Sequence, residues 1–133
     1  MIGIDTNVFI RFLVDEADSD QSKKAKQFIA ERTDNDPAFV SAVVLAETVW
    51  LLNRHLKFPV ETVVSALRSL FSTNEFEFEY RRQILEVLNA PVKRKVDIAD
   101  HLISFASRFH QCSKTVTFDK AAAKHIPHME LLS

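Results

Sequence analysis

Short runs of β-forming residues alternate with longer helical segments along the whole chain, and this order limits the fold more than any other feature. Turn signals such as Asp34-Asn35-Asp36-Pro37 and Phe58-Pro59 separate the segments. Alternation of this kind is typical of a parallel sheet covered by helices on both faces. We predict an α/β fold with a central, mostly parallel sheet, with strands at 2–5, 38–41, 76–78, 115–118 and 129–132 and helices at 7–14, 20–32, 42–56, 60–72, 80–89, 98–109 and 119–125.

Length and composition predict one domain over residues 1–133. The chain has 133 residues, of which 47% are hydrophobic, enough for a single core. It has no run of about 18 apolar residues and no signal peptide, so we expect a soluble, cytoplasmic protein. The single cysteine, Cys112, excludes an intrachain disulfide and a cysteine-based zinc site, and we expect a small buried side chain there.

The overall charge argues against a protein that coats nucleic acid. The net charge is −1 and the pI is near 6.5, values that still allow a local basic groove. Lys93-Arg94-Lys95 is the densest basic run and is a candidate for holding phosphates, although an ordinary solvated surface explains it equally well. The five histidines are not spaced as a metal set, and we expect them to be scattered over the surface.

Two aspartates stand where a predicted strand passes into a predicted helix. Asp5 follows Met1-Ile2-Gly3-Ile4, and Asp119 follows Thr115-Val116-Thr117-Phe118. Either one alone is best explained as a helix N-cap, the commonest use of Asp at such a place. In a parallel sheet, however, these junctions lie along one edge, where ligands bind in open α/β folds. Capping and metal binding are compatible, since the helix N-terminus favours a carboxylate.

Asp97-Ile98-Ala99-Asp100 opens a third helix of this kind. We expect Asp97 to be its N-cap and Asp100 its third residue, a spacing that resembles a capping box. This spacing allows one of the two acids to be purely structural, and the helical wheel does not decide which one. Asp100 lies off the apolar stripe of the helix, which fits either the mouth of a cleft or plain solvent.

Glu47 lies in the middle of the predicted helix 42–56, where its helical neighbours Val43, Val44, Trp50 and Leu51 are apolar. We expect a carboxylate in an apolar surround, which has to find a cation, hydrogen-bond donors or a proton. An ion pair with a distant Arg or Lys is the alternative. Together the four acids predict a metal site.

Four motifs in this order resemble the PIN-domain family, most closely the VapC-type toxins of bacterial toxin–antitoxin pairs. They span nearly the whole chain and read Met1-Ile2-Gly3-Ile4-Asp5-Thr6-Asn7-Val8, Ser41 through Leu45-Ala46-Glu47-Thr48-Val49-Trp50, Asp97-Ile98-Ala99-Asp100-His101-Leu102-Ile103 and Thr115-Val116-Thr117-Phe118-Asp119-Lys120. The family often has a glycine shortly before the third motif and another after its helix. Here those places read Arg94-Lys95-Val96 and His110-Gln111-Cys112.

The resemblance implies a three-layer α/β/α sandwich that cleaves RNA as a Mg²⁺- or Mn²⁺-dependent endonuclease. By motif, the acidic quartet of catalytic and metal-binding residues is Asp5, Glu47, Asp100 and Asp119. Asp97 is then an accessory acid or a cap, and the candidates for supporting roles are Thr6, Asn7, Ser41 and Thr117. The expected partners are an RNA substrate, a cognate antitoxin protein and a second copy of the chain.

Two other functions are compatible with parts of the sequence. A receiver domain of a signalling system also pairs an α/β fold with acids around Mg²⁺, but it needs an Asp at the end of a central strand, and the second strand ends at Val40-Ser41. A catalytically silent PIN-like module that binds RNA or protein keeps the fold without the reaction. The intact acids argue against that silent module.

Overall fold

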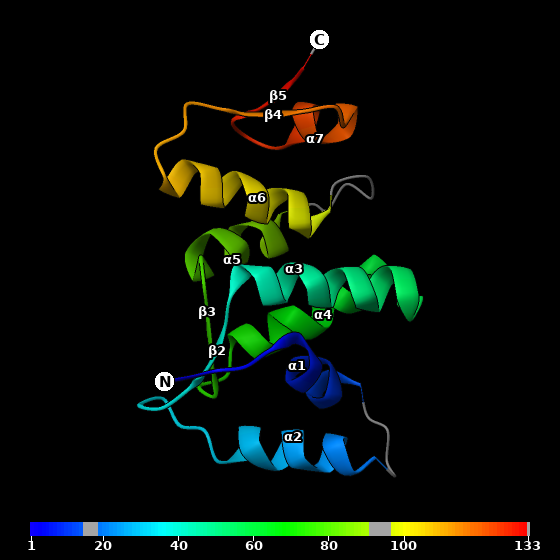
Figure 1. Ribbon diagram of the computed structural model, residues 1–133, viewed down its shortest axis with the longest axis vertical. Coiled ribbons are helices and arrows are strands. Elements are labelled where there is room, and N and C mark those ends of the chain that lie inside the picture. Colours follow the sequence, from blue (N-terminus) through cyan, green and yellow to red (C-terminus); the bar gives the residue numbers. More distant parts are fainter. Residues whose placement is uncertain (15–18, 91–96, 133) are drawn as a thin grey trace. The chain divides into compact units, whose positions relative to one another are not determined.

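The computed structural model describes residues 1–14, 19–90 and 97–132, in two compact units, Met1–Arg81 and Arg82–Ser133. Most of their elements are labelled in Figure 1. The single-domain organisation stays a prediction. The basic run Lys93-Arg94-Lys95, and with it the first of the two expected glycine positions, lies outside the described residues. In the described ranges, no helix is long and apolar enough to cross a membrane.

The first unit is built on a three-stranded sheet whose strands are all parallel. Its strands β1 (Ile2–Gly3), β2 (Ala38–Val40) and β3 (Phe76–Phe78) are arranged with β2 in the centre. Between β1 and β2 the chain forms α1 (Thr6–Leu13) and α2 (Asp20–Ala30). Between β2 and β3 it forms α3 (Ala42–Trp50), the π-helical turn η1 (Leu51–His55) and α4 (Val60–Phe71).

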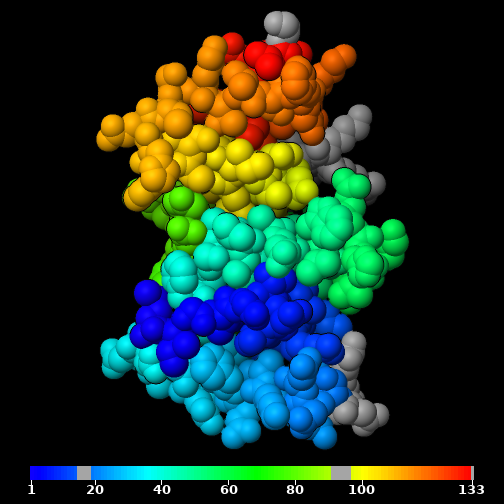
Figure 2. Space-filling view, viewed as in Figure 1, coloured from blue at the N-terminus to red at the C-terminus, as the bar shows by residue number. Residues whose placement is uncertain are grey.

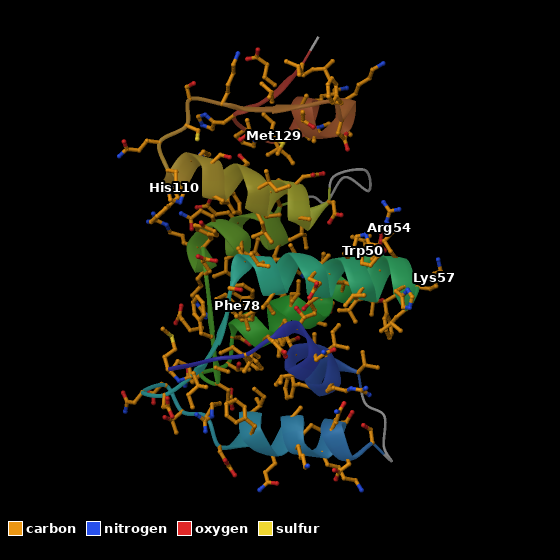
Figure 3. All side chains as sticks on the ribbon, in the orientation of Figure 1. Trp50, Arg54, Lys57, Phe78, His110 and Met129 are labelled. Atoms are coloured by element: carbon orange, nitrogen blue, oxygen red, sulfur yellow. The ribbon has the colours of Figure 1, made fainter. Side chains whose placement is uncertain are left out.

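Phenylalanine rings fill the core of the first unit. Phe71 of α4 stacks on Phe78 of β3, with ring centroids 4.1 Å apart, and Phe9 of α1 lies 5.7 Å from Phe76. All four rings are buried, and Phe78 is labelled in Figure 3. Helix α1 also packs against α2 and α3 (Figure 1). These contacts hold the amino-terminal ends of α1 and α3 at the sheet.

The second unit contains a pair of parallel strands joined through one short helix. Ala122, Ile126 and Met129 form its buried cluster. The hydroxyl of Ser104, which is fully buried, donates a hydrogen bond to the Pro127 carbonyl at 3.0 Å. The elements are α5 (Arg81–Asn89), which starts at the boundary of the units, α6 (Ile98–Phe109), β4 (Thr115–Thr117), α7 (Lys120–His125) and β5 (Met129–Leu131).

The predicted elements are confirmed in type and order, and their ends agree with the structure within two residues. The α/β class with parallel strands is likewise confirmed. The strands are hydrogen-bonded in two sheets, β1-β2-β3 and β4-β5. One difference lies at the end of the predicted helix 42–56, where the last turn is π-helical, with the Leu56 N–H donating to the Leu51 carbonyl at 2.9 Å.

Helix α6 ends in a Schellman motif that has no glycine. The Cys112 N–H donates to the Ser107 carbonyl and the Gln111 N–H to the Arg108 carbonyl, both at 3.0 Å. Gln111, the residue before Cys112, has a left-handed backbone conformation, with φ of 65°. Glycine is the usual residue at this position because it has no Cβ. The chain therefore keeps the turn at a place where the resemblance leads one to expect glycine.

Cys112 is exposed, so the expectation of a buried cysteine is wrong. Its place in the chain explains the difference, since it follows the left-handed residue just beyond the end of α6. Such a turn faces solvent because its side chains no longer follow the apolar stripe of the helix. Phe109, in the last turn of α6, is also exposed.

Candidate active site

Three polar residues directly follow, or lie one position beyond, the strands of the first sheet. Asp5 comes after β1, Ser41 after β2 and Glu79 after β3. Because the strands are parallel, their carboxyl ends share one edge, where open α/β sheets bind their ligands. Asp5 and Ser41 therefore lie at the edge where they were expected.

Asp5 is the N-cap of α1. The Val8 N–H donates to Asp5 Oδ1 at 3.0 Å, so the capping interpretation is confirmed. In the described part of the chain, the second carboxylate oxygen, Oδ2, accepts no hydrogen bond, and the side chain is exposed. A carboxylate with one oxygen committed to a cap retains acceptor capacity for a cation. Beside it, Thr6 is buried and Asn7 is exposed.

Glu47 is exposed, so the expectation that it lies in a buried apolar surround is wrong. Two of its apolar neighbours are themselves at the surface, with 78% of Val43 and 51% of Trp50 exposed, and Val44 and Leu51 are only half-buried. The opposite side of α3 is the buried one, through Leu45 and Val49. The alternative, an ion pair with a distant Arg or Lys, is not seen either, because Glu47 forms no ion pair with any described residue. Glu47 is therefore an exposed carboxylate on a partly apolar face of α3.

Glu79 is an acid at the sheet edge that sequence reasoning missed. Its Oε1 accepts a hydrogen bond of 2.7 Å from the Ala42 N–H, and its own N–H donates to the Val40 carbonyl at 3.0 Å. Ser41 caps the same helix, since its Oγ accepts from the Val44 N–H at 3.2 Å. The available signal was position, because Glu79 follows Phe76-Glu77-Phe78. Its bond to Ala42 gives it a structural role at the start of α3.

In the second unit, Asp97 caps α6 and Asp100 lies one turn into the helix. The Ala99 N–H donates to Asp97 Oδ1 at 3.1 Å, which confirms Asp97 as the cap. Burial raises the pKa of Asp100 above its ordinary value, and the charges of Asp97 and Asp119 raise it further. Burial lowers the pKa of the adjacent His101, against the opposing effect of the Asp97 charge. Two neighbouring carboxylates thus add to the effect of burial on Asp100.

Asp119 repeats the arrangement of Asp5. The Ala122 N–H donates to Asp119 Oδ1 at 3.0 Å, so Asp119 is the N-cap of α7. Thr117, one of the predicted supporting residues, contacts it directly, since its Oγ1 accepts from the Asp119 N–H at 3.0 Å. The side chain of Asp119 is exposed. This contact fixes the backbone of Asp119 at the end of β4.

The donor chemistry of these acids fits a hard divalent cation. Carboxylate oxygens are the ligands that Mg²⁺ takes, and a cation near Asp100 would offset the burial and the carboxylate repulsion that raise its pKa. The predicted quartet is divided between the units, with Asp5 and Glu47 in the first and Asp100 and Asp119 in the second. Among the described residues, no group of three or more His, Cys, Asp or Glu is gathered closely enough to hold a metal ion.

A comparison with protein families gives a match to the PIN domain over residues 2–127. The chain belongs to the PIN-domain family. PIN domains are commonly nucleases and generally use divalent metal ions, and their α/β fold agrees with the parallel strands and helices described above. The family excludes the receiver alternative. No curated protein in the comparison matches this PIN domain, and its likeness to the VapC-type toxins stays a prediction.

Proposed function

We propose that this PIN domain is a metal-dependent endoribonuclease that hydrolyses RNA phosphodiester bonds. The observation that carries the proposal is the family match over residues 2–127, a span that includes all four acids of the predicted quartet. In this proposal Asp5, Glu47, Asp100 and Asp119 supply the carboxylates that hold Mg²⁺ or Mn²⁺. The bound cation would polarise the phosphodiester and lower the pKa of a water.

The residues of the chain prepare the acids for this role. Asp5 and Asp119 each commit Oδ1 to the first turn of a helix, which fixes the carboxylate and leaves Oδ2 for a ligand. Thr117 and Ser41 fix the backbone where β4 and β2 end. Glu47 presents its charge from the exposed side of α3. Fixing a carboxylate in advance lowers the ordering cost when it binds a cation.

We further infer a role as the toxin of a toxin–antitoxin pair. This inference rests on the order and context of the four motifs, which resemble VapC-type toxins. A cognate antitoxin would then lay an amphipathic segment along an apolar groove and present a basic side chain to the acids. A homodimer is part of the same proposal.

The test is cleavage of structured and unstructured RNA by the purified chain with Mg²⁺ or Mn²⁺, against the same reaction with chelator. Asp5→Asn and Asp100→Asn should lower the rate by about 100-fold or more, as expected when a preorganised electrostatic group is lost. Asn caps helices as well as Asp does, so Asp5→Asn removes the charge and keeps the cap. Asp34→Asn, in an exposed turn, is the matched control and should keep full activity.

The same proteins separate the nuclease from a silent binding module. Divalent metal should raise the melting temperature of the parent chain, because it relieves repulsion among the acids. Full activity of Asp5→Asn would refute the assignment of the site. RNA binding without metal-dependent cleavage of any substrate, by protein shown to be folded and free of antitoxin, would favour the silent module.

A further inference from the structure

The carboxyl-terminal end of the α3–η1 helix carries an aromatic ring and two cations at the surface. We call Trp50, Arg54 and Lys57 the Trp50 patch. Trp50 is 51% exposed, and Arg54 and Lys57 are exposed as well. Figure 3 labels Trp50 and Arg54 beside each other at this end of the helix, with Lys57 just beyond it, and the blue-green segment lies at the surface in Figure 2.

Backbone hydrogen bonds hold the patch in place. The π-helical turn closes with Leu56 N–H donating to Leu51, and the Phe58 N–H donates to the Leu52 carbonyl, both at 2.9 Å. The Asn53 side chain donates to the Phe58 carbonyl at 3.0 Å. Lys57, which lies between the donors Leu56 and Phe58, has a left-handed backbone with φ of 62°. Such π-helical turns are frequently found at functional sites.

The patch carries two cations and no acid of its own. No Asp or Glu occurs between Glu47 and Glu61. Within the described ranges, neither Arg54 nor Lys57 forms an ion pair with a carboxylate. A chain of net charge −1 thus presents a local cationic surface around an exposed tryptophan. Cations interleaved with an aromatic ring are the elements that single-stranded nucleic acids bind.

The patch lies next to a proposed catalytic residue on the same helix. Trp50 is three residues beyond Glu47, and Arg54 is four beyond Trp50, so the three share one side of the helix. The rise from Glu47 to Trp50 is only about 4.5 Å. A strand held on the patch would therefore pass beside Glu47.

We propose that the Trp50 patch binds single-stranded RNA, with one base stacked on Trp50 and neighbouring phosphates on Arg54 and Lys57. The proposal rests on the proposed ribonuclease function and names a surface that positions its substrate. Trp50, Arg54 and Lys57 are positioning residues, since they act on the RNA away from the reacting bond. Base-paired RNA fits less well because its base faces are already stacked.

A second copy of the chain is a poorer occupant of this surface. A symmetric dimer through the patch would place it against itself. Arg54 and Lys57 would then face the same two cations, with no acid of the patch to neutralise them. Phosphates supply the missing negative charge, and a base supplies the ring that stacks on Trp50.

The experiment uses the fact that Trp50 is the only tryptophan of the chain. Intrinsic fluorescence of the 133-residue chain carrying Asp5→Asn is followed in chelator while a short oligouridylate is added. We expect saturable quenching, with no comparable change on addition of an RNA duplex of the same length. The same oligonucleotide carrying a dye reports binding independently by anisotropy.

Variants then test each role by anisotropy. Trp50→Ala should weaken binding by roughly 5- to 150-fold, the range expected for loss of one stacked base, whereas Trp50→Phe should retain most of the affinity. Arg54→Gln and Lys57→Gln should each reduce the slope of log affinity against log salt by about 0.7. Lys23 is an exposed lysine of α2, and Lys23→Gln is the matched control. It should leave both the affinity and its salt dependence unchanged.

Several results would refute the proposal that the Trp50 patch binds single-stranded RNA. Binding seen by anisotropy without a change in Trp50 fluorescence, or equal binding of duplex, would contradict stacking on Trp50 while leaving the nuclease proposal intact. A fluorescence shift that depends on protein concentration and is unaffected by RNA would show that a second copy covers the patch. Neither binding nor metal-dependent cleavage by the parent chain would refute both proposals, whereas cleavage with unaltered affinity of Trp50→Ala would refute only the patch.

Discussion

Asp100 connects the electrostatics of the second unit to its stability. Burial and the charges of Asp97 and Asp119 raise its pKa in the folded protein. As pH rises above the ordinary value of 3.8, the unfolded chain therefore releases the Asp100 proton before the folded chain does. The folded state loses stability over this interval, and the loss is complete above the raised pKa.

Asp100→Asn removes this loss, because the amide does not ionise. In chelator at pH 7, we expect the variant to have a higher free energy of unfolding than the parent, with a difference that shrinks as pH falls toward 3.8. Urea unfolding of both proteins from pH 7 down to pH 3.8 measures it, with Asp34→Asn, in an exposed turn, as the matched control for the loss of a carboxylate. A difference that is constant over this pH range would contradict the assigned cause.

Two buried hydroxyl groups make opposite contributions to stability. Thr48 and Ser104 are both fully buried, but Thr48 Oγ1 has no hydrogen-bond partner in the described residues, whereas Ser104 Oγ donates to Pro127. Thr48→Val should raise the free energy of unfolding by about 1 kcal/mol, and Ser104→Ala should lower it by about 1 kcal/mol. Denaturant midpoints at unchanged m-values measure both, and a loss of stability in Thr48→Val would show that its hydroxyl is satisfied.

At the scale of the element, the end of α6 combines a regular turn with an unfavourable residue. Gln111 keeps a left-handed backbone in the Schellman motif, at a cost to an L-residue of about 1–2 kcal/mol. Gln111→Gly removes that cost. It also lowers the free energy of unfolding by about 0.5–1 kcal/mol, because glycine has greater conformational freedom in the unfolded chain. We therefore expect a net gain of roughly 0.5–1 kcal/mol in thermal or urea unfolding.

Gln27→Gly is the opposing control for the Gln111 substitution. Gln27 is an exposed residue inside α2, where glycine lowers stability by about 1 kcal/mol. Opposite signs for the two substitutions would show that backbone conformation decides the effect. Equal losses would mean that the side chain of Gln111 contributes more than its strained backbone costs.

Helix starts were predictable because their signals are local. Asp5, Asp97 and Asp119 each precede a helix, and each accepts a hydrogen bond from its first turn. The exposed side of α3 was not predictable in the same way. This helix is apolar almost all round, so its sequence does not show which face the core covers, and Glu47 was wrongly expected to be buried. The π-helical turn also carries no local signal.

At the scale of the whole molecule, the alternating order of elements predicted the parallel pairing of strands. The residue pairing within the sheets was not predictable, because strands of two or three residues contain too short a pattern to define a register. Glu79 was missed for a related reason, since its significance arises from the strand beside it. The joint action of the four acids stays a prediction that the cleavage experiment tests.

The parallel pairing also gives the chain an order of assembly. Thr115 pairs with Met129, which is only 14 positions later in the chain, whereas Ile2 pairs with Ala38, which is 36 positions later. Because loop-closure entropy grows with the logarithm of loop length, closing the shorter loop costs about 0.8 kcal/mol less. Contacts between distant residues also slow folding. Of the described strands, β1 leaves the ribosome before the others, and its partner β2 follows only after about three dozen further residues have been synthesised.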